Sequence, residues 1–137
     1  MFVGIIYSTE KDVIEKISEG LKRGIEEQGK QVMLYPDSSD TVSGLAACKL
    51  VLVGTYAPTF FKVKTPVRLN NILDRAGGLA GKRSIAFTSD TGSRGRKALH
   101  AVMNDMERQG CVVIDQQSLR TEKEAYQYGA SLKLREK

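Results

Sequence analysis

FVGIIYST, residues 2–9, opens the chain with a nearly continuous apolar run that stops at two hydroxyl side chains. Such a run is typical of a strand that is buried on both faces, as in the centre of a parallel sheet. Apolar residues at helical spacing follow over 11–28, and Gly29 marks the end of that helix. The sequence therefore predicts a strand and a helix that are joined by a polar turn.

Four more apolar runs repeat this order along the chain. The other expected strands are 31–35, 49–54, 83–88 and 111–115, and the other expected helices are 42–47, 66–76, 93–109 and 121–134. Strict alternation predicts an α/β domain in three layers, with a five-stranded parallel sheet between helices on both faces. The 137 residues, 41% of them hydrophobic, suit a single domain over 1–137.

The net charge of +5 and the isoelectric point near 9.3 favour anionic partners. Nucleic acid is not expected, because no recognition motif accompanies the charge. The apolar runs are too short to span a bilayer and the N-terminus lacks a signal-peptide pattern, which predicts a cytoplasmic protein without membrane contact. Cys48 and Cys111 open the third and fifth strands about 10 Å apart, so we expect free thiols.

Polar residues follow three of the strands, and parallel strands bring their carboxyl ends to one edge, where α/β proteins bind ligands. In the first loop, Ser8 and Thr9 precede a helix whose free N–H groups and dipole favour an anion. The alternative is that one of them, or Asp12, only caps that helix. Because no glycine lies between Tyr7 and Lys11, the dinucleotide fingerprint and the phosphate loop of nucleotide triphosphatases are excluded.

The second loop, 55–65, holds three of the nine aromatic residues, and a planar ligand would stack there unless Phe60 and Phe61 fold back onto the core. In the third loop, 89–93 is rich in small donors. It leads into three cations in the first turn of a helix, Arg94, Arg96 and Lys97, where each opposes the helix dipole by roughly 0.3–1 kcal/mol. This cost indicates a nearby anion, which is either a ligand or Asp90.

No catalytic or metal-binding group can be assigned from the sequence. His100 is the single histidine and falls beside the apolar stripe of its helix, where we expect an exposed side chain. Without a second histidine or a spaced cysteine pair, the pattern indicates no metal site. A phosphoacceptor receiver domain needs an aspartate at the end of the third strand. Thr55 stands at that position, so this class of domain is excluded.

Three segments carry a resemblance to a known family: VLVGTYAPTFFKVKTPVRLNNILDRAGGLAGKRSIAFTS at 51–89, DTGSRGRKALHAVMNDMERQGCVVI at 90–114 and AYQYGASL at 125–132. Together they resemble the flavodoxin-like superfamily, and most of all its small flavodoxin domains and FMN-dependent reductases. The resemblance spans essentially the whole chain. It implies the strand order 2-1-3-4-5 and non-covalent binding of FMN.

The resemblance also implies a set of cofactor-binding residues. The first loop would bind the phosphate, the second would pack on the flavin and the third would approach its pyrimidine edge. Carried onto this chain, the residues are Ser8 and Thr9 for the phosphate, Thr55, Tyr56 and Phe60 for the flavin, and Ser89, Asp90, Thr91 and Gly92 for the edge. The leading hypothesis is an FMN-binding redox protein, an electron carrier or a reductase component, with an acidic redox partner or a small anionic acceptor.

A second hypothesis starts from where the chain departs from the family. The family's first loop reads T/S-x-T-G-x-T, whereas YSTEK at 7–11 is several residues shorter and brings Glu10 toward the phosphate position. Electron-carrying flavodoxins also tend to be acidic. The competing hypothesis is therefore a flavodoxin-like domain that has lost FMN and binds another anion or a protein. Whether the chain is an enzyme, and whether it forms a homodimer, is left open by the sequence.

Overall fold

The computed structural model describes residues 1–40, 42–58 and 62–134. In chain order the elements are β1 (Phe2–Tyr7), α1 (Asp12–Glu26), β2 (Gln31–Pro36), the 3-10 turn η1 (Leu45–Ala47), β3 (Cys48–Thr55), α2 (Val67–Arg75), β4 (Arg83–Thr88), α3 (Gly92–Arg108), β5 (Val112–Ser118) and α4 (Glu122–Ser131). Three predicted elements differ from the structure by more than two residues at one end. The helix expected at 42–47 is only the 3-10 turn, the fifth strand continues to Ser118 instead of ending at 115, and the last helix ends at Ser131 instead of 134.

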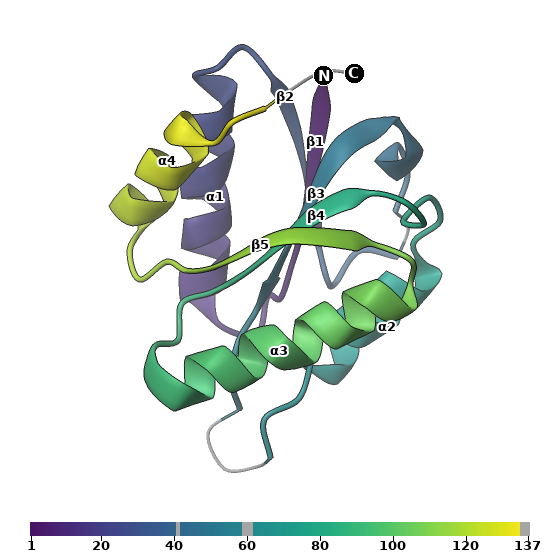
Figure 1. Cartoon of the computed structure of the whole chain (residues 1–137), viewed down its shortest axis with the longest axis vertical. Coiled ribbons are helices and arrows are strands. Elements are labelled where there is room, and N and C mark those ends of the chain that lie inside the picture. Colours follow the sequence, from purple (N-terminus) through teal and green to yellow (C-terminus); the bar gives the residue numbers. More distant parts are fainter. Residues whose placement is uncertain (41, 59–61, 135–137) are drawn as a thin grey trace.

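The five strands form one parallel sheet in the order β2-β1-β3-β4-β5, as the resemblance implied. Helices α1 and α4 cover one face of the sheet, and α2 and α3 cover the other (Figure 1). This is the three-layer α/β arrangement that the alternation of strands and helices predicts. Within the described residues, no helix is both long enough and apolar enough to cross a membrane.

The central strands explain why their sequences are apolar without interruption. Ile5 belongs to the core cluster under α1 and α4, whereas its neighbour Ile6 belongs to the cluster under α2 and α3. Leu52 and Val53 of β3 divide between the two clusters in the same way, and all four side chains are completely buried. Successive side chains of a strand point to opposite faces, so a strand between two helical layers needs apolar residues at every position.

The two cysteines lie where the sequence places them. Cys48 begins β3 and Cys111 directly precedes β5, with β4 between these strands. Both thiols are free and buried in the core cluster under α2 and α3, and burial raises their pKa values. The expectation of free thiols is confirmed.

Helices α1 and α4 approach each other closely because glycines lie at their contact. An ideal Cβ on Gly24 would lie 2.7 Å from the backbone nitrogen of Ala130, and one on Gly129 would lie 2.7 Å from the carbonyl oxygen of Leu21. Gln28 adds hydrogen bonds of 2.8 Å from its side-chain nitrogen to the carbonyl oxygens of Gly129 and Leu132. The backbones of α1 and α4 are therefore in direct contact at these glycines.

This contact makes Gly24→Ala strongly destabilising. The added methyl group meets rigid backbone, and overpacking of this kind costs about 1–3 kcal/mol of unfolding free energy. Urea denaturation measures the loss. Gly77→Ala is the matched control, because no atom lies within 4 Å of its Cβ position and its φ is not positive. Equal stability of the two variants would contradict the close packing of α1 on α4.

Candidate functional site

The carboxyl ends of β1, β3 and β4 meet at one edge of the sheet. Tyr7 pairs with Gly54 and Thr55 pairs with Thr88, so the residues that follow these strands share one rim. The amide of Ser8 donates a hydrogen bond of 3.1 Å to the carbonyl oxygen of Gly54, which joins the first loop to the second. The convergence of the three loops expected from the sequence is present.

In the first loop, the donors of Thr9 are used by a carboxylate of the chain itself. Asp37 follows β2, and its Oδ1 accepts hydrogen bonds from the Thr9 amide at 3.2 Å and the Thr9 hydroxyl at 2.6 Å. The Asp37 side chain is completely buried, and Arg68 of α2 lies 3.6 Å from the same oxygen. Asp37 was not among the site residues predicted from the sequence.

The start of α1 is acidic and lacks the cap that the sequence offered as an alternative. Its N-cap residue is Lys11, with no side-chain hydrogen bond to the helix, so Ser8, Thr9 and Asp12 do not cap it. Ser8 is buried and accepts a hydrogen bond of 3.4 Å from the Glu10 amide. Asp12 and Glu15 supply negative charge in the first helical turn, which complements the helix dipole without a ligand.

Tyr56 packs onto the first loop, where it is only 8% exposed. Its hydroxyl donates a hydrogen bond to Oε2 of Glu10, and the Nζ of Lys11 lies 5.1 Å from the centre of its ring. Burial and the bond to Glu10 raise the pKa of Tyr56 to about 12. The ring that was expected to stack on a flavin therefore packs against residues 10 and 11, beside a hollow of about 540 Å³ that Pro58 and Thr65 also line. Phe60, also expected there, lies outside the described residues.

In the third loop, Asp90 joins three parts of the rim. Its Oδ2 accepts hydrogen bonds from the Ala57 amide at 2.7 Å and the Thr88 hydroxyl at 3.2 Å, and its carbonyl oxygen accepts one of 2.9 Å from Ser118. In the described part of the chain, Arg94 forms no ion pair with it, so the alternative that Asp90 neutralises Arg94 is wrong. The remaining predicted residues of this loop are Ser89, half-buried, and Thr91 and Gly92, both exposed.

The rim as it stands does not fit FMN. A phosphate at the first loop would have to displace the buried Asp37 carboxylate from Thr9, and a ring between the second and third loops would have to part Ala57 from Asp90. Glu10 adds a negative charge at the same place. Among the described residues, the Thr55 hydroxyl is a buried group at this rim that has no hydrogen-bond partner.

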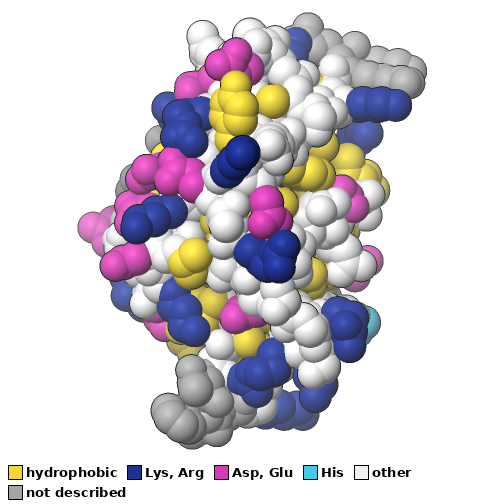
Figure 2. Space-filling model, turned by 90° about the vertical axis from the view of Figure 1, so that its left-hand side faces the viewer, with side chains coloured by type: hydrophobic (Ala, Val, Ile, Leu, Met, Phe, Trp, Pro, Cys, Tyr) yellow, Lys and Arg dark blue, Asp and Glu magenta, His cyan; other side chains and the backbone are white. Residues whose placement is uncertain are grey.

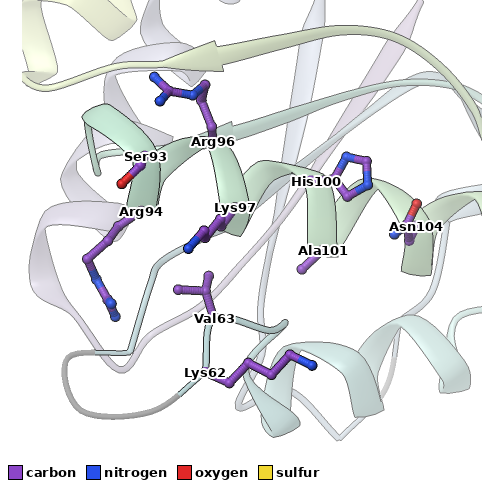
Figure 3. A pocket seen from close by; sticks show the side chains of 9 residues that line it. All are labelled: Lys62, Val63, Ser93, Arg94, Arg96, Lys97, His100, Ala101 and Asn104. Carbon is purple, nitrogen blue, oxygen red and sulfur yellow. The ribbon is translucent and has the colours of Figure 1, made fainter.

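An open groove runs beside this closed rim, between α3 and the segment that carries Lys62 and Val63 (Figure 3). We call it the α3 groove, and its volume is about 710 Å³. Its lining residues are Lys62, Val63, Ser93, Arg94, Arg96, Lys97, His100, Ala101 and Asn104. His100 is exposed, as expected. The sequence indicated the cations at the start of α3, and only the fold brings Lys62 into the same groove.

The cations of the α3 groove have no acidic partners in the described part of the chain. None of Lys62, Arg94 and Lys97 takes part in an ion pair there, although Arg23, Arg68 and Arg108 do. The first turn of α3 contains no acidic residue. Figure 2 shows Lys and Arg side chains gathered at the lower end of the molecule, whereas positive and negative side chains alternate above. The groove therefore carries uncompensated positive charge.

The described part of the chain contains no candidate metal site. Over 1–40, 42–58 and 62–134, no group of three or more His, Cys, Asp or Glu side chains is placed to hold a metal ion. The charges of the α3 groove are cationic, which suits anions instead.

Comparison with known proteins identifies the fold. No protein-family model and no curated protein sequence matches the chain. Solved structures match it over nearly its whole length. The two-electron reduced flavodoxin of Megasphaera elsdenii has a TM-score of 0.72 at 18% identity and covers 95% of this chain and 99% of its own. Flavodoxin 1 of Bacillus cereus gives 0.71 at 15% identity, with 95% of each chain covered. The flavodoxin WrbA-like protein of Agrobacterium tumefaciens gives 0.70 at 13%, covering 94% and 92%.

These similarities establish that the chain has a flavodoxin-like fold. At 11–18% identity they extend to the path of the chain and not to its ligands. What binds at the rim or in the groove must therefore be argued from the residues of this chain.

The closed first loop makes Asp37→Ala costly. The substitution leaves the Thr9 amide without its acceptor in a partly buried place, and loss of a hydrogen bond to a charged group costs about 1.5–3 kcal/mol. Urea denaturation should show this loss, whereas Asp40→Ala, an exposed position in the same turn, should change stability by less than about 0.5 kcal/mol. If both variants unfold alike, Asp37 does not hold the first loop.

Proposed function

We propose that this chain is a flavodoxin-like domain that binds an anionic ligand in the α3 groove and does not hold FMN between its loops. The proposal rests on a difference between the rim and the α3 groove. At the rim, Asp37 and Asp90 already accept the hydrogen bonds that a ligand would need. In the α3 groove, Lys62, Arg94 and Lys97 have no counter-charge in the described part of the chain.

The energetics of α3 support a ligand rather than a merely solvated surface. Arg94 lies in the first helical turn, at the positive end of the dipole, where a cation costs about 0.3–1 kcal/mol. Lys97 lies in the second turn of the same helix. The side chain of the N-cap residue Thr91 accepts no hydrogen bond from the N–H groups at the start of the helix. A bound anion would reverse this cost, because its charge is attracted both by the cations and by the helix terminus.

A second candidate function is the FMN-binding redox protein, either an electron carrier or a reductase component with an acidic or anionic partner. The flavodoxin-like fold favours it, and so does the buried Thr55 hydroxyl, a polar group at the rim with no partner among the described residues. The flavin would supply the electron transfer. The chain would have to release Asp37 from Thr9 and Tyr56 from Glu10 before the cofactor could enter.

The absorbance spectrum of the purified protein, with FMN fluorescence and thermal unfolding in added ligands, separates the two candidates. We expect a colourless protein that leaves FMN fluorescence unchanged and whose melting temperature rises in pyrophosphate. A flavin spectrum, or quenching of FMN fluorescence at stoichiometric protein, would support the redox candidate instead. Indifference to every anion would contradict the α3 groove as a binding site.

Removing the two helix cations should stabilise the unliganded protein. Arg94→Gln combined with Lys97→Gln should raise the unfolding free energy at low salt by about 0.3–1 kcal/mol, because the unfavourable interaction of Arg94 with the helix dipole is lost. The same variant should lose the stabilisation by pyrophosphate. Lys16→Gln with Lys49→Gln is the matched control, since it removes the same charge from exposed positions outside the groove. A double variant that is less stable without ligand would show that these cations serve the fold.

A further inference from the structure

We infer that the ligand of the α3 groove is a phosphorylated small molecule with an uncharged polar body. This inference rests on the proposed anion-binding function and adds to it the chemical class of the ligand. The phosphate would lie among Lys62, Arg94 and Lys97, and the body would extend along α3 to His100 and Asn104.

The groove is longer than a phosphate ion. Ser93, Lys97, His100 and Asn104 recur at helical spacing along one side of α3, and all of them line the groove. From the first to the last, the helix rises by about 16 Å at 1.5 Å per residue. The volume of about 710 Å³ falls within the range of about 300–1,000 Å³ that is typical of small-molecule sites. A simple anion would fill only a part of it.

The cations that α3 contributes to the groove lie at one end of it. Arg94 and Lys97 belong to the first part of α3 and point toward the segment with Lys62 and Val63 (Figure 3). Farther along the helix, the lining changes to His100 and Asn104, which offer hydrogen-bond donors and acceptors. A ligand that is charged throughout would leave much of its charge without a partner there. The arrangement fits one anionic group joined to a neutral polar body.

Small apolar side chains also line the groove. Val63 lines it from the loop, near Lys97 (Figure 3), and Ala101 lines it from α3, between His100 and Asn104 in sequence. Neither side chain projects far, so a sugar or a flat ring can lie against them while its polar edge meets the imidazole and the amide. Apolar walls with a few placed polar groups are the usual make-up of such sites.

The test is calorimetric titration of the full chain at fixed ionic strength with inorganic phosphate, ribose 5-phosphate and AMP. At least one of the two esters should bind about tenfold more tightly than phosphate. Arg94→Gln with Lys97→Gln should abolish binding of all three probes. Asn104→Ala and His100→Ala should weaken that ester alone and leave the affinity for inorganic phosphate unchanged. Lys16→Gln with Lys49→Gln should leave every affinity unchanged.

Failure of this inference can be told from failure of the proposed function. If phosphate binds and depends on Arg94 and Lys97, but neither ester binds more tightly, the inference is overturned while anion binding stands. Tighter binding of a glutamate oligopeptide or a single-stranded oligonucleotide than of both esters would also overturn it, in favour of a macromolecular partner. If no anion binds, the proposed function falls with it.

Discussion

The parallel pairing of β1 with β3 in the middle of the sheet is the constraint on which the rest of this molecule depends. Both strands are buried on two faces, so neither can move without exposing core residues on both sides. Their pairing delivers Ser8 and Thr55 to one rim, and the neighbouring strands add Asp37 and Thr88. The strand order therefore determines which residues lie at the rim.

The distribution of charge divides this rim from the α3 groove. At the rim, carboxylates are turned inward and accept the free donors of the loops, as Asp37 does for Thr9 and Asp90 does for Ala57. In the α3 groove, Lys62, Arg94 and Lys97 line open space and have no ion-pair partner in the described part of the chain. Repulsion among like charges and an opposed helix dipole both reduce stability. In this domain the unfavourable electrostatics lie in the groove, and that is why we assign the ligand to it.

Much of the architecture could be predicted because burial patterns are local. The run at 2–7 predicts a central strand with the same bounds as β1, and the run at 83–88 does the same for β4. The largest errors lie where burial is partial. The fifth strand is an edge strand with alternating exposure, and its last three residues are polar, so the apolar run ended before the strand did. The helix expected at 42–47 lacked enough residues to continue beyond a single 3-10 turn.

By itself, the sequence determined the class of sheet, the bounds of its central strands and the set of loops that share an edge. Only the tertiary structure decided which of those loops stay open. Thr9 meets Asp37 because β2 lies beside β1, and Lys62 meets the cations of α3 because the chain after β3 folds toward that helix. Periodicity reports how each segment is buried, whereas a binding site depends on side-chain contacts between segments that are distant in the chain.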